Sequence, residues 1–91
     1  MKWEKSDLQI GEELNLPDKM FFSKERMIRS KYIGETDHGI FARCEFLPVF
    51  ETTQDYSYTV FISWASIYCG KVVVTSGNRT INARLKDKTH G

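Results

Sequence analysis

Apolar residues recur at every second position in several short stretches of this chain, and residues typical of turns separate the stretches. From position 40 the alternation puts Ile40, Ala42, Cys44 and Phe46 on one face and Phe41, Arg43 and Glu45 on the other. The run Tyr56–Trp64 consists almost entirely of β-branched and aromatic residues. A period of two residues is that of a β-strand, and these residue types favour a pleated, half-buried surface. The sequence therefore predicts a mainly β fold.

Capping and turn residues divide the chain into short elements. Ser6 and Gln9 fit a capping box, which predicts a helical turn that ends at Gly11. Small hydroxyl residues in Ser63–Ser66, ahead of Gly70, predict a second helical turn. Turns are expected at Thr36–Gly39, where a glycine is available for positive φ, and at Ser76–Asn78. Strands are expected around Leu14 and Leu16, over Met20–Ile33, Ile40–Phe46, Tyr56–Trp64 and Lys71–Thr75, and as a possible last strand over Ile81–Leu85.

The whole chain, residues 1–91, is expected to form a single small domain with residues 86–91 as a polar tail, because half of it is too short to bury a core. Five to six short strands would form a strongly bent antiparallel sheet or an SH3-like or OB-like barrel with short helical turns. The alternative is an α+β fold with one helix near Phe22–Ile28. Tyr56–Trp64 is expected as the central strand, and the expected core residues are Val60, Ile62, Val72 and Val74.

Charge and cysteine content restrict the function and the location. Thirteen Lys and Arg against twelve Asp and Glu leave a formal charge of +1, which lacks the strong positive field of a nucleic-acid binder. The first residues are charged where a secretion signal is apolar, and no apolar stretch reaches the length of a membrane span. We expect a cytoplasmic protein that does not enter membranes, in which Cys44 and Cys69 stay reduced as small core residues.

The sequence contains no set of residues with the spacing of a catalytic or metal site. His38 lies in the glycine-containing turn and His90 in the tail, and both are expected to be exposed polar residues. Cys44 and Cys69 lack the C-x-x-C spacing of a zinc site. We therefore expect no enzyme activity, no catalytic residue, no metal and no cofactor.

Two segments combine residue types that suit a binding surface. The expected loop Pro48–Asp55 and the strand after it place carboxylates beside aromatic rings, which can steer toward a basic protein surface and then anchor on it. The candidate partner-binding residues there are Phe50, Glu51, Asp55, Tyr56 and Tyr58. The alternative is a basic patch that could contact phosphate, formed by Arg79, Arg84, Lys86 and Lys88. Aromatic residues next to expected breaks are candidate exposed anchors, namely Trp3, Phe22, Phe50 and Tyr56.

Two stretches carry a resemblance to known proteins. Residues 3–17, beginning Trp3-Glu4-Lys5-Ser6-Asp7-Leu8-Gln9-Ile10-Gly11, and the later Ile67-Tyr68-Cys69-Gly70-Lys71-Val72-Val73 resemble small uncharacterised phage and prophage proteins of Gram-positive bacteria. Such proteins are short, single-domain and often inhibitors of host defence, anti-CRISPR proteins among them. The resemblance implies a non-catalytic inhibitor that binds a nucleic-acid-handling host protein, for example a Cas nuclease or its nucleic-acid complex. The formal charge of +1 predicts that free DNA is bound weakly or not at all. The alternative function is a small nucleic-acid-binding β-barrel, which requires basic and aromatic residues on one face.

Overall fold

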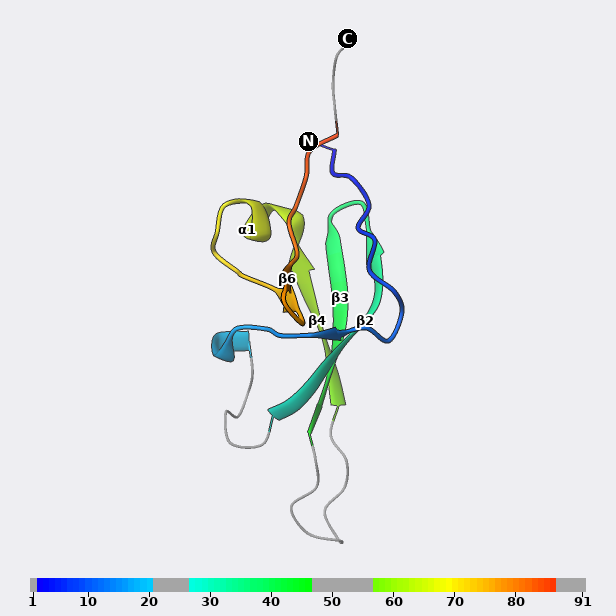
Figure 1. The fold of residues 1–91 in the computed structure, drawn as a ribbon, viewed down its shortest axis with the longest axis vertical. Helices are drawn as coiled ribbons and strands as arrows, with labels where there is room; N and C mark the ends of the chain where they lie inside the picture. The colour runs from blue at the N-terminus through cyan, green and yellow to red at the C-terminus, as the bar shows by residue number, and fades with distance from the viewer. Residues whose placement is uncertain (1, 21–26, 47–56, 87–91) are drawn as a thin grey trace, which may run out of the picture.

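The computed structural model describes residues 2–20, 27–46 and 57–86, and these residues form a mainly β fold, as predicted. Figure 1 shows the arrangement of the strands and of the helix in the described part of the chain. The elements are β1 (Glu13–Leu14), the 3-10 turn η1 (Asp18–Met20), β2 (Met27–Thr36), β3 (Gly39–Phe46), β4 (Ser57–Ser63), α1 (Trp64–Tyr68), β5 (Thr75–Ser76) and β6 (Arg79–Thr80).

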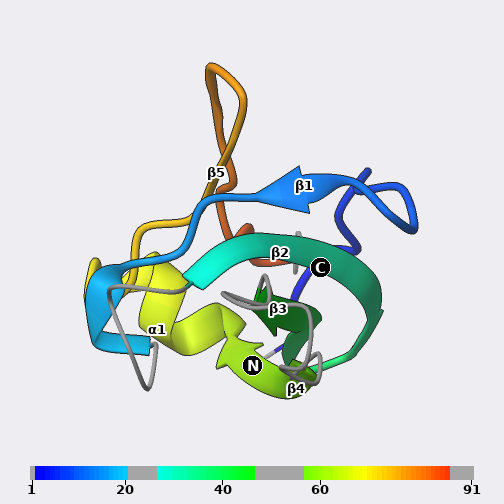
Figure 2. The same ribbon diagram turned by 90° about the horizontal axis from the view of Figure 1, so that it is seen from below.

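The main sheet is antiparallel, with its strands in the order β1-β2-β3-β4. The turn expected at Thr36–Gly39 joins β2 to β3. The register of this pair shifts between Met27 and Arg29 and between Tyr32 and Gly34, and such bulges bend a strand. Figure 2 shows β2 as a strongly curved ribbon. The described strands therefore form an open, bent antiparallel sheet, not the closed barrel that was the other expectation.

The core lies on one side of this sheet, which we call the inner face. On β3 its residues are the fully buried Ile40, Ala42 and Cys44. Ile62 of β4 lies opposite Ile40 and is buried as well, and the segments after β4 cover the inner face with Trp64, Val72, Val74 and Ile81. Of the expected core residues, Ile62, Val72 and Val74 are buried, and Val60 is half-buried and packs against the same cluster.

Strand β4 forms an edge of the sheet, so the prediction that Tyr56–Trp64 is the central strand is wrong. Among the described strands β4 pairs with β3 alone. Tyr56 lies outside the described residues, and Trp64 already belongs to α1. Both faces of β4 carry apolar residues. One face contacts the core through Ile62, and the other presents Phe61, which is 44% exposed.

Helix α1 begins where the sequence predicts a helical turn. The backbone N–H of Ser66 donates to Oγ of Ser63, the N-cap, at 3.1 Å. The chain leaves the helix through Gly70, whose φ of +83° lies in the left-handed region that favours glycine. The buried indole of Trp64 fixes the helix to the core. None of the helical segments that the structure describes is long and apolar enough to cross a membrane.

The segment after α1 is less regular than predicted. Only Thr75 of the expected strand Lys71–Thr75 belongs to a strand, and Ile81–Leu85 forms none. A short hairpin of β5 and β6 turns instead at the predicted position, through Gly77 with φ +61°. The alternation in this segment reflects burial of its apolar residues Val72, Val74 and Ile81 against the core. An extended segment that crosses a core buries alternate side chains even where it has no partner strand.

The N-terminal segment contains no helical turn at Ser6–Gln9, so that prediction is wrong. Oγ of Ser6 accepts from the backbone N–H of Leu8 at 3.2 Å, and the N–H of Gln9 donates to the Glu12 carboxylate at 3.0 Å. The Gln9 N–H is therefore satisfied by a residue further along the chain and not by the expected cap.

The N-terminal segment lies alongside the last described residues (Figure 1). The N–H of Glu4 donates to the Arg84 carbonyl at 2.7 Å, and the N–H of Lys86 donates to the Lys2 carbonyl at 2.9 Å. Trp3 forms an isolated bridge with Leu85, and its ring packs edge-on against another aromatic ring, that of Tyr68, at a centroid distance of 5.4 Å. Trp3 is only 9% exposed, so its prediction as an exposed anchor is wrong.

The strand expected at Met20–Ile33 begins later than predicted, because Met20 ends the 3-10 turn η1 and β2 starts at Met27. Met27 and Ile28 belong to β2, and the rest of the alternative helix at Phe22–Ile28 lies outside the described residues.

The two cysteines occupy different environments. Cys44 is fully buried on β3, as predicted, and Oγ of Ser30 lies 3.5 Å from its sulfur. Cys69 follows α1 and is exposed, so the prediction of a core role is wrong for this residue. The residues around Cys69 in the sequence did not indicate that the chain leaves the core at the end of α1, where Cys69 lies.

Candidate functional site

The side of the sheet that faces away from the core carries a pair of aromatic rings. Phe41 of β3 and Phe61 of β4 lie opposite each other, with ring centroids 5.0 Å apart and planes inclined at 54°. On the other side of Phe41 the register places Gly34, which has no side chain. The two rings therefore stand beside an open strip of backbone, and Phe61 is among the large apolar residues that the fold leaves exposed.

Gly39 allows the Phe61 ring to take this position. A Cβ atom at Gly39 would lie 2.8 Å from Cζ of Phe61 and 2.8 Å from Cα of Ser63. The sequence predicts positive φ as the reason for a glycine here, but Gly39 has no positive φ. Its role is to permit a close approach of strand and ring.

Charged residues surround the aromatic pair on the same side of the sheet. Nε of Arg29 lies 3.4 Å from the Glu13 carboxylate, and Nε of Arg43 lies 3.9 Å from that of Glu45. Arg43 also donates from Nη2 to Oγ of Ser57 at 2.8 Å. We call this side the outer face; its residues are Glu13, Arg29, Lys31, Phe41, Arg43, Glu45, Ser57, Thr59 and Phe61.

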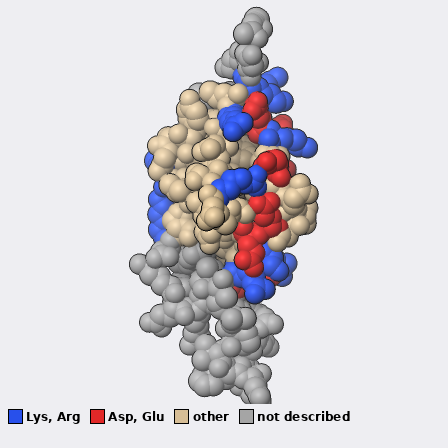
Figure 3. Space-filling model, in the orientation of Figure 1, with Lys and Arg blue, Asp and Glu red and all other residues tan. Residues whose placement is uncertain are grey.

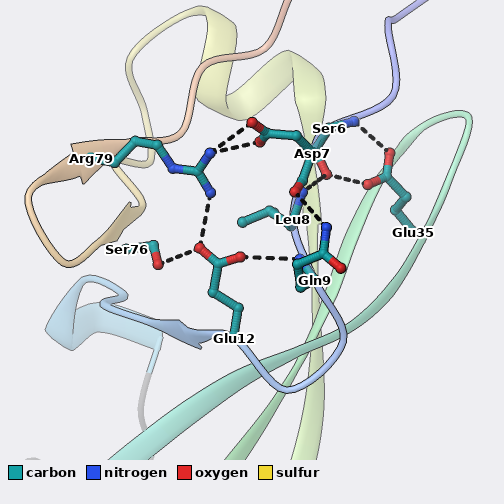
Figure 4. A network of polar contacts seen from close by, with 8 residues as sticks. All are labelled: Ser6, Asp7, Leu8, Gln9, Glu12, Glu35, Ser76 and Arg79. Carbon is teal, nitrogen blue, oxygen red and sulfur yellow. Dashed lines mark hydrogen bonds and ion pairs between the residues drawn. The ribbon is translucent and has the colours of Figure 1, made fainter.

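A second polar cluster joins the N-terminal segment to the hairpin of β5 and β6 (Figure 4). Nη1 of Arg79 lies 2.8 Å from each carboxylate oxygen of Asp7, and Nη2 lies 2.9 Å from Oε2 of Glu12. Oγ of Ser76 donates to the same Glu12 oxygen at 2.6 Å. The Ser76 hydroxyl and the Gln9 N–H lower the pKa of Glu12, with a further contribution from Arg79. We call this cluster the Arg79 clasp; it consists of Asp7, Gln9, Glu12, Ser76 and Arg79.

A third group of polar contacts ties the N-terminal segment to β2. The backbone N–H of Ser6 donates to Oε2 of Glu35 at 3.1 Å, and its hydroxyl donates to Oε1 of the same carboxylate. The Tyr32 hydroxyl donates to Oε1 at 2.8 Å. Burial, followed by the hydrogen bond to Glu35, raises the pKa of Tyr32 to about 12. Each of these polar groups is satisfied within the protein, so the contacts serve to hold the fold.

Beside the clasp lies a groove of about 380 Å³ between residues 4–7 and 79–84. Its lining contains both signs of charge. The acidic residues are Glu4 and Asp7, and the basic residues are Lys5, Arg79 and Arg84. Figure 3 shows the same mixing, with acidic and basic side chains alternating in a band over the N-terminal segment while the rest of that view is mostly uncharged. The groove therefore has no field of one sign that would select an ion.

Most of the predicted partner-binding loop lies outside the described residues, namely Phe50, Glu51, Asp55 and Tyr56. Tyr58 is described and is half-buried. It lies opposite Cys44 on the inner face, and its hydroxyl donates to the Met20 carbonyl at 3.3 Å. The structure therefore separates Tyr58 from the outer face.

The predicted basic patch is only partly open to a ligand. Arg79 is held by the clasp, whereas Arg84 and Lys86 have exposed side chains. Lys88 lies outside the described residues, as does Phe22, one of the predicted anchors.

Sequence reasoning missed the pairing of Phe41 with Phe61. One signal for it is present in the alternation, which puts Phe41 on the same side of its strand as Arg43 and Glu45. An aromatic ring between charged side chains on the solvent side of a strand has no packing role in the core and is a candidate contact residue.

The described residues contain no cluster of three His, Cys, Asp or Glu residues that could hold a metal ion. Comparison with protein-family models, curated proteins and solved structures finds no match for the chain. What the outer face can do is bury two rings and exchange its ion pairs with those of a partner.

Proposed function

We propose that the protein is a non-catalytic binding domain that docks on another protein through the outer face of its sheet. The observation that carries this proposal is the exposed ring of Phe61, paired with the half-buried Phe41 and lying beside charged residues of both signs. Protein interfaces typically bury an aromatic centre and surround it with a polar rim, and a few central side chains supply most of the binding energy.

The charges on the outer face favour a protein partner over a nucleic acid. Three basic residues, Arg29, Lys31 and Arg43, are accompanied by the carboxylates of Glu13 and Glu45. Both arginines form ion pairs, so much of the positive charge that would release counterions from a phosphate backbone is already compensated. Stacking of bases on Phe41 and Phe61 remains the alternative, since basic and aromatic residues do share this face.

We further propose that the partner is a host protein that handles nucleic acid, such as a Cas nuclease, and that docking inhibits it. The resemblance of residues 3–17 and 67–73 to small phage proteins supports this choice. The carboxylates of Glu51 and Asp55 add to it, because a protein that holds nucleic acid presents a basic channel toward which acidic groups are steered.

The docking surface is tested by comparing captured proteins between variants. Phe61→Ala removes an exposed ring, and we expect it to raise the dissociation rate of the captured partner by at least about tenfold, as for a central interface residue. Ile10→Ala is the matched control, because Ile10 is 72% exposed and lies in a turn outside the sheet. If both variants release the partner at the wild-type rate, the outer face is not the docking surface.

The choice of partner needs a separate experiment. A Cas nuclease is mixed with guide, target DNA and this protein, and we expect cleavage to slow with wild-type protein and to recover with Phe61→Ala. Unchanged cleavage with several such nucleases would remove the inhibitor proposal and leave the docking proposal to the capture experiment.

A further inference from the structure

Strand β4 has one edge with which no other described strand pairs. The N–H of Trp64 donates to the His38 carbonyl at 2.9 Å, which fixes the phase of the β3–β4 ladder. Because hydrogen-bonded residues alternate in an antiparallel pair, Tyr58, Val60 and Ile62 point their backbone groups at β3. The intervening residues Ser57, Thr59, Phe61 and Ser63 point theirs away from the sheet.

These outward backbone groups find no partner strand in the part of the chain that the structure describes. Outside the ladders, Asn15 pairs with Thr75 and Tyr32 with Glu12, but no such backbone bond involves Thr59 or Phe61. Figure 2 shows β4 at the border of the sheet, with no described strand beyond it.

The opposite edge of the sheet is closed. β1 has only two residues, and directly after it Asn15 and Thr75 exchange two backbone hydrogen bonds of 2.7 and 3.2 Å. The hairpin of β5 and β6 therefore continues the sheet where β1 ends. Only β4 among the described strands offers a long edge for pairing.

Strand β4 also lacks the features by which proteins protect an edge. Such edges usually carry a lysine, a proline or a bulge, and a long uncharged edge without them pairs readily with another strand. β4 reads Ser-Tyr-Thr-Val-Phe-Ile-Ser, with no charged residue and no proline. Its register with β3 is continuous, whereas that of β2 with β3 shifts twice.

The strand is complementary to a second copy of itself. In the antiparallel register of full overlap, Val60 lies on the two-fold axis, Ser57 faces Ser63 of the second copy, and Thr59 faces Phe61 of the second copy. Thr59 and Phe61 of each strand then exchange backbone hydrogen bonds with the second copy, whereas the carbonyl of Ser63, the N-cap of α1, is used by the helix. Thr59 beside Phe61 is a pairing of a β-branched with an aromatic side chain, which stabilises sheets, and no like charges meet.

We propose that two copies of this chain pair through β4 and form one continuous eight-stranded antiparallel sheet. A two-fold axis at Val60 makes the interface close on itself, so that association stops at the dimer. The pairing places the outer faces of both copies on the same side of the joined sheet. This inference does not rest on the proposed protein partner, because it concerns the purified chain alone.

The test is sedimentation analysis of the purified protein over a range of concentrations. We expect a dimer for the wild type and at least a tenfold weaker dimer for Thr59→Pro. Proline removes the outward N–H of Thr59 but no hydrogen bond to β3, and edge strands tolerate proline in this orientation. Thr59→Ala is the matched control: it keeps the N–H and loses only the side-chain contact with Phe61 of the second copy, so its dimer should be weakened much less than that of Thr59→Pro.

A measurement on the unmodified protein keeps the proposal testable even if the proline variant does not fold. Amide hydrogen exchange at Thr59 and Phe61 should slow as the protein concentration rises, while exchange at exposed Asn78 in the β5–β6 turn stays unchanged. A monomer at every concentration, or a dimer with unprotected Thr59 and Phe61 amides, would overturn the proposal.

Discussion

Single residues in this protein take their roles from groups far away in the sequence. Arg79 lies 72 positions from Asp7 and 67 positions from Glu12, yet its guanidinium bonds to both carboxylates. The clasp links the N-terminal segment to the β5–β6 hairpin, because Arg79 belongs to β6 and both of its carboxylate partners belong to the N-terminal segment. Its energetic effect depends on the ionised state of the carboxylates.

We predict that the stabilising effect of the Glu12 charge depends on pH. In the unfolded chain Glu12 titrates near its ordinary value of 4.5, and the hydrogen bonds from Ser76 and Gln9 lower its pKa in the folded protein. The ionised carboxylate therefore stabilises the fold above about pH 4.5, and this contribution is lost as the pH falls through the folded pKa.

Urea unfolding at several pH values measures the effect. The free energy of unfolding of Glu12→Gln should fall below that of the wild type at neutral pH, and the two should converge in acid. Glu13→Gln is the control, because the Glu13 carboxylate is exposed and, among the described residues, forms an ion pair with Arg29 at 3.4 Å outside the clasp. A difference between wild type and Glu12→Gln that is the same at every pH would contradict the prediction.

At the scale of elements, β4 links the core to both proposed surfaces. Its inner side supplies Ile62 to the core, its outer side supplies Phe61 to the aromatic pair, and its backbone forms the open edge. Both faces of β4 therefore carry apolar residues. A central strand that is buried on both faces shows the same pattern, so the sequence could not distinguish the two positions.

We predict that Ile62→Ala lowers the free energy of unfolding by about 2–5 kcal/mol, because it leaves a cavity at a fully buried position of the core. Val73→Ala, at a residue that is 58% exposed, should change it by less than about 0.5 kcal/mol. Chemical denaturation of both variants checks the contrast. Equal losses for the two variants would mean that the core is not where the structure places it.

Much of the strand content could be predicted from the sequence, but the neighbours of each strand could not. Alternation is a local property, so it located β3 and the buried face of Ile40, Ala42 and Cys44. The order of the strands depends on pairing between residues that are distant in the sequence. Strand β4 is an edge because the described segment after α1 packs on the core and adds no strand beside β4.

The candidate site was harder to predict than the fold. Phe41 carried a local signal, but its contact with Phe61 joins residues of two strands. Arg79 was predicted to be available for a phosphate contact. In the structure its guanidinium is paired with the carboxylates of Asp7 and Glu12, which are distant in the sequence. Trp3 was predicted to be exposed because it lies next to an expected break, and its packing against Tyr68 joins residues that are far apart in the sequence.

At the scale of the whole molecule, charges of both signs are mixed over the surface. The formal charge is +1, and Arg79, Arg29 and Arg43 all lie in ion pairs with carboxylates. A molecule with this distribution produces only a weak field at a distance, so its recognition depends on close contact.

We predict that the protein binds free duplex DNA with a Kd weaker than about 1 µM at about 150 mM salt, because the formal charge is only +1 and carboxylates are mixed with the cationic side chains. Fluorescence anisotropy with labelled duplex measures this value. A variant that combines Asp7→Ala with Glu12→Ala frees Arg79 and should bind more tightly, with a steeper dependence on salt. Submicromolar binding by the wild type would favour the nucleic-acid-binding alternative.

The hydrogen bonds between residues 2–4 and 84–86 delay the folding of the N-terminal segment during synthesis. During synthesis residues 2–4 leave the ribosome long before their backbone partners, residues 84–86, have been made. The hairpin of β2 and β3 can form early, because its contacts are local. Trp3, however, stays without its bridge partner until Leu85 emerges, so the nascent chain exposes this apolar side chain to chaperones until then.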